Sequence, residues 1–298
     1  MMEKLAVIIN GKAAQRKRAL VDQYLAALHK QQFNLEVVET SHPQHATTIA
    51  KQAYDRGITH FACMGGDGTN FEVINGLFPI NPDSARKPKL ILLPLGTGNS
   101  FLKDFSKDNP LHSLQAFERR KVVPCDAIEV RHPSGTFYFM NLLSLGFVAD
   151  VAFLRNKSFS AFGTFGYVLA VIAKTLTLKA TTFQYTLNDH RQKTDHTFLS
   201  FDNSKYTGGN MMMAPLADTS DGLVDMIAVE PMGRLELLAT FPKIFTGDHL
   251  RHDKVRCEQI SKIDFHGMSA RAVMVDGESL KIAIDHLRVI PQALEIYA

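Results

Sequence analysis

The sequence contains little cysteine, and what it has is scattered. Cys63, Cys125 and Cys257 are odd in number and far apart along the 298 residues. This pattern excludes a disulfide framework and a clustered thiolate zinc site, and it favours a reducing cytoplasm. An excess of charge is lacking too, because 33 Lys and Arg against 30 Asp and Glu leave a formal charge of +3. The basic residues at 16–18 and 119–121 form short clusters that are typical of solvated faces, so we expect no nucleic-acid partner.

Long hydrophobic runs and targeting signals are also lacking. The longest nearly uncharged stretch, 159–173, is interrupted by two glycines and is shorter than the roughly 20 residues that cross a bilayer. The first residues lead directly into a strand-like segment at 5–10, without the basic and apolar pattern of a signal peptide. We therefore expect a cytoplasmic protein without a membrane span, for which peripheral contact with the inner membrane face stays open.

The length and the 45% of apolar residues suffice for two domains with sizeable cores. In the first part of the chain, strand-like runs alternate with segments of helical spacing. The strand-like runs are 5–9, 35–38, 60–64 and 90–93, and the helical segments are 16–30, 43–56 and 69–77. This alternation predicts a doubly wound, mostly parallel sheet with helices on both faces.

The pattern changes near residue 123. Strand-like segments separated by turns follow at 127–130, 136–143, 182–187, 197–201, 223–229, 262–265, 272–275 and 281–284. Helical stretches at 162–178 and 234–245 interrupt them. We therefore expect an α/β domain at 1–122 and a β-rich, sandwich-like domain at 123–286. The last segment, 287–298, is compatible with packing back on the first domain.

Two glycine-rich loops follow strands of the first domain. Residues 65–70 read Gly-Gly-Asp-Gly-Thr-Asn and open a helix, and residues 94–99 read Pro-Leu-Gly-Thr-Gly-Asn. Glycines let a backbone approach a phosphate, and N–H groups at a helix start attract it. Asp67 suits such a site when Mg²⁺ lies between the carboxylate and the phosphate; a tight turn ending in a helix cap is the alternative. Two such loops share the edge of the sheet where ligands bind, and neither is a Walker A or dinucleotide motif.

Two acidic turns lie in the second domain. Asp276-Gly277-Glu278 suits a tight hairpin turn, or a turn that aims a carboxylate at a substrate hydroxyl. Asp218 and Asp221, with a backbone carbonyl near Leu223, offer oxygen ligands for a hard divalent ion. A solvated turn is the alternative there, because the full EF-hand pattern is missing.

The two glycine loops, with Glu72 and the Asn-Gly pair at 75–76, resemble the diacylglycerol kinase catalytic-domain family. That family includes bacterial lipid kinases, sphingosine kinases and ceramide kinases, and it is distantly related to NAD kinases. Shorter motifs extend the resemblance over nearly the whole chain: 141 with 144–147, 214–215 with 221–222, and 276–278. The resemblance implies an ATP- and Mg²⁺-dependent kinase that transfers the γ-phosphate to a hydroxyl of a lipid, such as diacylglycerol or a related amphiphile.

The resemblance also implies roles for individual residues. Glu278 is the expected proton acceptor, with Asp276 beside it and Asp67 as the third catalytic residue. The expected ATP site comprises Asn10, Thr40, Gly65, Gly66, Asp67, Gly68, Thr69, Asn70, Gly96, Thr97 and Asn99. Asp126 is expected to join Asp67 around nucleotide-bound Mg²⁺, and the turn of Asp218, Asp221 and Leu223 is expected to bind a second Mg²⁺. Ser100 stands where the family usually has aspartate, which predicts weaker Mg²⁺ binding.

Two other functions stay open as alternatives. One is a soluble-substrate kinase of the NAD kinase type, whose relatives share Gly-Gly-Asp-Gly but usually have Asn-Glu in the second motif. The other is a catalytically weak, nucleotide-binding regulatory protein, which the replacement at Ser100 favours. Nucleotides other than ATP and a homodimer also stay open.

The segment 147–178 bears on the acceptor, because it is rich in aromatic and aliphatic residues. As a helix it would carry one apolar stripe of Phe162, Phe165, Leu169 and Ile172. Basic residues bracket the segment, as expected near anionic headgroups. The segment predicts peripheral membrane contact and an amphiphilic substrate, with ordinary core packing as the alternative.

Overall fold

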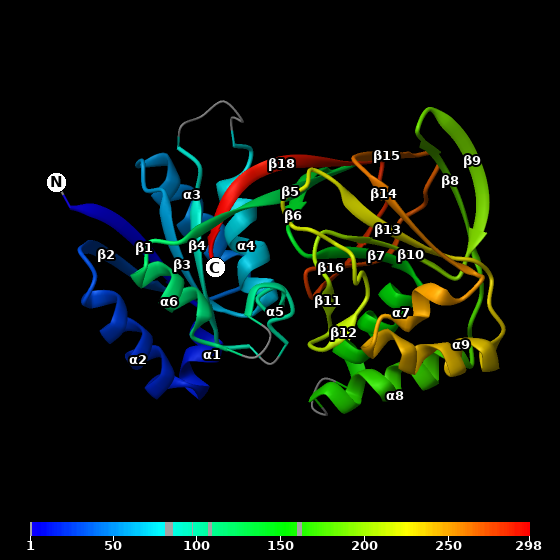
Figure 1. Ribbon diagram of the computed structural model, residues 1–298, viewed down its shortest axis with the longest axis horizontal. Coiled ribbons are helices and arrows are strands. Elements are labelled where there is room, and N and C mark those ends of the chain that lie inside the picture. The colour runs from blue at the N-terminus through cyan, green and yellow to red at the C-terminus, as the bar shows by residue number, and fades with distance from the viewer. Residues whose placement is uncertain (1, 81–85, 97, 107–108, 160–162) are drawn as a thin grey trace. The chain divides into compact units, whose positions relative to one another are not determined.

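The computed structural model describes residues 2–80, 86–96, 98–106, 109–159 and 163–298, and it divides into two units (Figure 1). Unit 1 comprises Met1–Ala127 with Gln292–Ala298, and unit 2 comprises Ile128–Pro291. The first boundary lies later than residue 122, because strand β5 (Val122–His132) begins in one unit and ends in the other. Strand β18 (His286–Tyr297) likewise starts in unit 2 and ends in unit 1.

The sheet of unit 1 is parallel and has the order β2-β1-β3-β4-β18. Its other strands are β1 (Glu3–Ile9), β2 (Phe33–Glu39), β3 (His60–Gly65) and β4 (Lys89–Pro94). Strand β2 lies on one side of β1 in the sheet, and β3 lies on the other side of β1. The loops after β1 and β3 therefore flank the topological switch point, where open α/β sheets bind ligands. The expected doubly wound sheet is confirmed.

Helices cover both faces of this sheet (Figure 1). On one face lie α1 (Gly11–Arg16), α2 (Arg18–His29) and α6 (His112–Glu118), and on the other α3 (His45–Asp55) and α4 (Asp67–Leu77). The short α5 (Lys103–Ser106) follows the second glycine loop. The helix expected at 16–30 is preceded by α1, which Asn10 caps. Helix α3 begins at His45, so Pro43 precedes it and does not form its first turn.

Helices α3 and α4 pack against each other through Glu72 and Gly76, two residues of the family motifs. The Glu72 carboxylate accepts the backbone N–H groups of Gln44 (2.9 Å) and Ala46 (3.2 Å) at the start of α3. A Cβ on Gly76 would lie 2.2 Å from the carbonyl oxygen of Thr47. Glu72 and Gly76 thus hold α3 close against α4, which carries the first glycine loop at its start.

Unit 2 is built on a six-stranded antiparallel sheet of order β14-β13-β10-β7-β16-β17. Its strands are β7 (Leu142–Gly146), β10 (Phe198–Asp202), β13 (Val224–Val229), β14 (Val255–Ile260), β16 (Arg271–Val275) and β17 (Glu278–Ile282). Further antiparallel pairs form the second layer, from β5, β6 (Gly135–Phe139), β8 (Thr181–Leu187), β9 (His190–His196), β15 (Lys262–Phe265) and β18. The small β11–β12 pair (Tyr206–Thr207 and Met211–Met212) lies in sequence between β10 and β13. The β-rich, sandwich-like prediction is confirmed.

Three helices accompany the six-stranded sheet: α7 (Phe147–Leu154), α8 (Gly163–Thr175) and α9 (Arg234–Thr240). A π-helical turn (Arg155–Phe159) follows α7, and two 3₁₀ helices (Phe241–Phe245 and Asp248–Arg251) follow α9. The sequence did not predict α7, β9 or β14. Six of the seven β9 residues are exposed, so no apolar alternation marks that strand.

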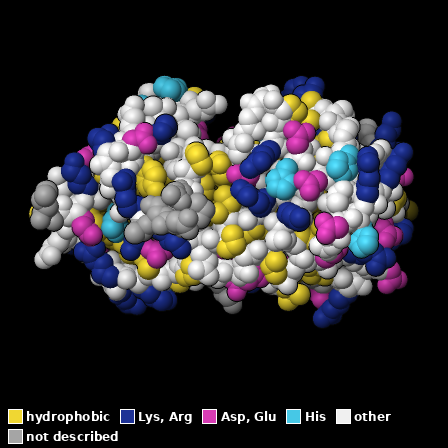
Figure 2. Space-filling model, turned by 90° about the horizontal axis from the view of Figure 1, so that it is seen from above, with side chains coloured by type: hydrophobic (Ala, Val, Ile, Leu, Met, Phe, Trp, Pro, Cys, Tyr) yellow, Lys and Arg dark blue, Asp and Glu magenta, His cyan; other side chains and the backbone are white. Residues whose placement is uncertain are grey.

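Charged side chains are mixed on the surface. On the face drawn in Figure 2, Lys and Arg are interspersed with Asp and Glu. Members of both short basic clusters form ion pairs, Arg18 with Asp22 and Glu39, and Arg120 with Glu3. Within the described residues, no helix has the length and apolar character that a membrane span requires.

Two acidic side chains are buried opposite each other in the six-stranded sheet. Asp202 of β10 pairs in register with Asp225 of β13, and both are almost fully buried. Neither carboxylate oxygen of Asp202 has a hydrogen-bond partner, and Oδ2 of Asp225 has none either. Burial raises the pKa of Asp202 well above its usual value, the nearby Ser200 hydroxyl lowers it in part, and the charge of Asp225 raises it further.

This raised pKa predicts a pH-dependent loss of stability. In the unfolded chain an aspartate titrates near ~3.9, so ionising buried Asp202 costs folding free energy as the pH rises above that value. Asp202→Asn removes the cost, and we expect its free energy of unfolding at pH 8 to exceed that of the wild type by about 1–3 kcal/mol. The difference should vanish near pH 4. Urea titrations across this range, with exposed Asp253→Asn as the control, measure it; parallel pH profiles for Asp202→Asn and wild type would contradict the prediction.

Candidate active site

The two glycine loops meet at the edge of the parallel sheet. A Cβ on Gly96 would lie 2.9 Å from the Cα of Gly66, so the loops touch through glycine backbone. The N–H of Leu95 donates to the carbonyl oxygen of Gly65 at 2.7 Å and fixes the contact. The expectation that both loops share one edge is confirmed.

The loop after β1 joins them across the switch point. The Asn10 Nδ2 donates to the Thr69 hydroxyl at 3.0 Å, while its Oδ1 accepts the Ala13 N–H and caps α1. The Thr40 hydroxyl accepts the N–H of Gly11 at 3.2 Å. The structure thus brings Asn10, Thr40 and Thr69 together, whereas Thr97 lies outside the described residues.

Asp67 is the first residue of α4, and its two carboxylate oxygens have different surroundings. Its Oδ2 accepts the Ser100 N–H at 3.0 Å, and its Oδ1 is buried without a hydrogen-bond partner. Burial raises the pKa of Asp67, although hydrogen bonds from the Ser100 and Phe101 backbone and the Ser100 hydroxyl lower it in part. Ser100 therefore donates to Asp67, where an aspartate at the same position would repel it.

Buried oxygens around Asp67 line a small pocket that suits a metal ion. The Oδ1 atoms of Asn70 and Asn99 are also buried without partners, and all three side chains line one pocket with Gly65. Buried polar atoms are normally hydrogen-bonded, so three unpaired acceptors in one pocket mark a place for a ligand. Carboxylate and amide oxygens are the ligands that Mg²⁺ accepts in proteins. The pocket measures about 10 Å³, which is room for one water molecule or small ion, so its residues fit the expected Mg²⁺ through the Asp67 carboxylate.

Asp126 has a structural bond within unit 1. It is fully buried, and its Oδ1 accepts the N–H of Gln292 at 2.6 Å. One oxygen of this carboxylate thus joins β5 to β18.

The late acidic turn separates its two carboxylates sharply. Asp276 and Gly277 have φ angles of 44° and 85°, as in a two-residue hairpin turn that joins β16 to β17. Buried Asp276 accepts three backbone N–H groups, with Oδ1 from Asn141 (3.1 Å) and Leu142 (2.9 Å) and with Oδ2 from Met140 (3.1 Å). Glu278 is exposed at the start of β17. Asp276 therefore anchors the turn, and Glu278 is the carboxylate that the turn presents.

The second acidic turn is organised by its own hydrogen bonds. Asp218 Oδ1 accepts the N–H and the hydroxyl of Ser220, and Asp221 Oδ1 accepts the N–H of Leu223. Both carboxylates are exposed. Over the described ranges, no group of three or more His, Cys, Asp or Glu side chains has a geometry suited to a metal ion. The second Mg²⁺ at Asp218, Asp221 and Leu223 stays a prediction.

Lys17 is a site residue that the sequence did not indicate. Its Nζ lies 3.5 Å from the carbonyl oxygen of Gly96 in the second glycine loop. Sequence reasoning placed it in the solvated cluster 16–18. Nothing in the local pattern could have shown the contact, because it depends on the break between α1 and α2.

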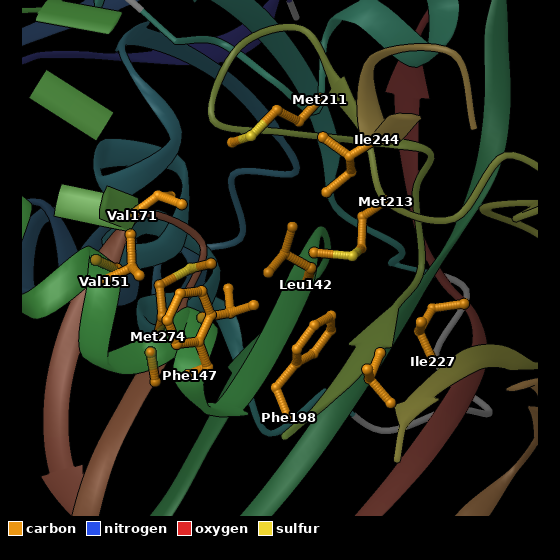
Figure 3. Close-up of a cluster of buried hydrophobic side chains, with 14 of the residues drawn as sticks. Leu142, Phe147, Val151, Val171, Phe198, Met211, Met213, Ile227, Ile244 and Met274 are labelled. Atoms are coloured by element: carbon orange, nitrogen blue, oxygen red, sulfur yellow. The ribbon is translucent and has the colours of Figure 1, made fainter. Parts of the chain in front are cut away.

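Unit 2 contains an apolar pocket between its six-stranded sheet and helices α7–α9. Figure 3 shows Phe147, Val151, Val171, Met211 and Met213 pointing into the surrounding cluster. The pocket has a volume of about 60 Å³ and an almost entirely apolar lining. The buried Met211 and Met213 are packing residues of this cluster.

Helix α8 turns one face to this pocket and leaves members of the predicted apolar stripe outside it. Tyr167 and Val171 line it, whereas Phe165 and Ile172 of the predicted stripe are 63% and 50% exposed. Phe162 lies outside the described residues. The helix is therefore both a core element and a source of exposed apolar surface.

A parallel sheet with an aspartate-bearing glycine loop, followed by an antiparallel sandwich, defines a phosphotransferase of the type that NAD kinases and diacylglycerol kinases share. Residues 4–130 match the diacylglycerol kinase catalytic domain, and residues 141–298 match the YegS C-terminal NAD kinase beta sandwich-like domain. The chain belongs to the diacylglycerol kinase catalytic-domain family, with a C-terminal domain of the YegS type.

Relatives match along most of their length. A protein named "Probable lipid kinase YegS-like" from Xanthomonas campestris pv. campestris (strain 8004) is 26% identical over 81% of this chain and 78% of its own. A protein of the same name from Yersinia pseudotuberculosis serotype I (strain IP32953) is 25% identical over 99% and 96%. The crystal structure of a diacylglycerol kinase from Bacillus anthracis str. Sterne has a TM-score of 0.77 at 20% identity, covering 99% of this chain and 97% of that one. The likeness to this structure supports the fold.

Proposed function

We propose that this protein is an ATP- and Mg²⁺-dependent lipid kinase that phosphorylates a hydroxyl of diacylglycerol or a related amphiphile. The observation that carries the lipid assignment is the apolar pocket of unit 2, together with the exposed apolar side chains on the helices around it. The names of the relatives agree with this assignment.

The proposed transfer needs a proton acceptor, a metal ligand and groups that bind the phosphates. The acceptor oxygen bonds to the γ-phosphorus as the bond to the bridging oxygen of the ADP leaving group breaks, and Glu278 takes the hydroxyl proton. Asp67 would hold Mg²⁺, which offsets the phosphate charge when bound. The N–H groups at the start of α4 and the glycine backbone at Gly66 and Gly96 bind the phosphates.

The apolar pocket suits the hydrocarbon part of the acceptor. An apolar cavity of about 150 Å³ holds a benzene ring, so a pocket of about 60 Å³ must widen to admit an acyl chain. Met211, Met213 and Met232 line it, and unbranched methionine side chains adapt to irregular shapes at low cost. The acyl chain therefore enters by displacing methionine side chains.

Exposed apolar residues continue from the pocket onto the outer surface of these helices. Seven lie on α7, α8, α9 or directly after them: Phe153, Phe165, Ile172, Leu176, Leu235, Leu238 and Phe245. Exposed cationic side chains accompany them at Lys157, Lys179, Arg234 and Lys243. Apolar side chains bracketed by cations are typical of surfaces that bind anionic membranes.

Vesicle flotation tests this surface. We expect the wild type to float with vesicles that contain phosphatidylglycerol, and Phe165→Ser/Ile172→Ser to reduce the floated fraction several-fold, because it removes exposed apolar area that would enter the bilayer. The matched control is Val37→Ser/Val38→Ser, an exposed pair on β2 of unit 1. Equal flotation of both variants and the wild type would contradict membrane contact through α8.

The acceptor can be identified with a total lipid extract, labelled ATP and Mg²⁺, with products resolved by mass. Label in a phosphorylated lipid is the expected result. Label only in water-soluble hydroxyl compounds would instead support the soluble-substrate alternative. Nucleotide binding without transfer to any extract would support a regulatory protein.

A further inference from the structure

A second cavity in unit 2 has a polar and cationic lining. It measures about 270 Å³ and lies among β8, β9 and the segment that leads into β16. Its lining includes the cationic side chains Lys193 and Arg271 together with His266, Gln184 and Thr182. No Asp or Glu lines it among the residues that the structure describes. All of these groups belong to unit 2, so the cavity is distinct from the glycine-loop site of unit 1.

Over the described parts of the chain, no carboxylate forms an ion pair with Arg271, which lines this cavity. The guanidinium carbon lies 4.9 Å from the centroid of the Phe183 ring, and Nε donates to the carbonyl oxygen of Ser269 at 3.4 Å. Burial lowers the pKa of Arg271, and the more distant Asp150, which pairs with Lys174, offsets this only in part. A half-buried guanidinium with mostly aromatic and backbone neighbours has donors left for an anion, and its planar fork matches phosphate oxygens.

The other polar groups are arranged around the same space. The His266 ring is fixed by a 2.7 Å contact between its Nε2 and the Thr186 hydroxyl, and its backbone N–H donates to Gln184. The nearby carboxylate on β9, Asp195, accepts the Thr182 hydroxyl. Exposed Lys193 adds an ammonium group to the lining that Arg271 shares. Two permanent cations and an imidazole around one polar cavity suit a doubly charged anion.

We propose that this cavity binds a phosphate group, as a second phosphate site separate from the nucleotide loops. Arg271 supplies a bidentate contact, and Lys193 supplies the second positive charge. The phosphate can belong to a small soluble compound or to the headgroup of a phospholipid, since both present the same oxygens.

Hydrogen exchange measured by mass spectrometry tests the proposal and localises the ligand. The probes are inorganic phosphate, glycerol 3-phosphate, and vesicles of phosphatidylcholine with or without phosphatidylglycerol. We expect slower exchange in peptides covering 182–195 and 264–272, rising with probe concentration. Protection by the soluble probes identifies a soluble ligand, and protection by phosphatidylglycerol vesicles alone identifies a headgroup.

Three variants separate this cavity from general charge effects. Arg271→Gln and the exposed Lys193→Gln should each lower the affinity for the probe, read from the concentration dependence of the protection, at least about tenfold. This is the usual scale for a charge-assisted hydrogen bond. Arg256→Gln removes the same charge at an exposed ion pair on β14, and it should change the affinity for the probe less than about twofold. The proposal is overturned if no probe protects these peptides, or if Lys193→Gln and Arg271→Gln respond to the probes as the wild type does.

Discussion

Replacing Glu278 with glutamine should lower kcat for phosphoryl transfer by about 10²–10⁴-fold, the usual scale for loss of a general base. Glutamine keeps the shape of the side chain and loses its basicity. Glu278 is exposed at the start of β17, and the turn is anchored by Asp276. The affinity for ATP and the thermal midpoint should therefore stay close to those of the wild type. Steady-state transfer assays and thermal unfolding measure the three quantities.

Asp276→Asn distinguishes the anchor from the base. Its carboxylate accepts three backbone N–H groups from residues 140–142, and an amide would turn an NH₂ group toward one of these donors. We expect a loss of stability of about 1–3 kcal/mol together with a loss of kcat, because the turn that positions Glu278 is loosened. Glu258→Gln, an exposed glutamate on β14, is the matched control for Glu278→Gln. A severe loss of kcat in Asp276→Asn at unchanged stability, with near-normal Glu278→Gln, would reverse the two roles.

The fold was largely predictable because its signals are local. The apolar run at β1 and the glycines after β3 mark a buried parallel strand and a loop that approaches a ligand. β9 gave no such signal, because six of its seven residues face solvent and it is defined by its pairing with β8. The boundaries of the units carry no local signal, because β5 and β18 each contribute to both units.

The site was predictable only as a set of residue types. The resemblance named both Asp276 and Glu278, but which one is the anchor depends on contacts between residues about 135 positions apart. The helical periodicity of the α8 sequence could not show that Val171 faces the pocket and Ile172 faces solvent, because both residues are apolar. Lys17 and the cationic cavity at Arg271 arise from tertiary contacts that no local pattern reports.

Asp67→Asn should abolish Mg²⁺-dependent transfer while the fold stays intact. The Oδ1 of Asp67 is buried without a partner and Oδ2 accepts the Ser100 N–H, so the amide can keep the Ser100 contact through its carbonyl oxygen. What it loses is the negative charge that would hold the metal. Because Ser100 stands where the family usually has a further carboxylate beside Asp67 and Asp126, we expect Asp67 to contribute more of the Mg²⁺ affinity than it would next to an aspartate.

The pH dependence of Mg²⁺ binding gives this prediction an independent readout. Burial raises the pKa of Asp67, so protons compete with the metal at a higher pH than they would at an exposed aspartate. The apparent Mg²⁺ affinity, measured by titration in the presence of ATP, should fall as the pH is lowered toward that raised pKa. In Asp67→Asn the affinity should be weak and should lack this pH dependence, whereas Asp55→Asn, an exposed aspartate paired with Lys51, should match the wild type. Near-normal turnover of Asp67→Asn would contradict the proposed role of Asp67 in Mg²⁺ binding.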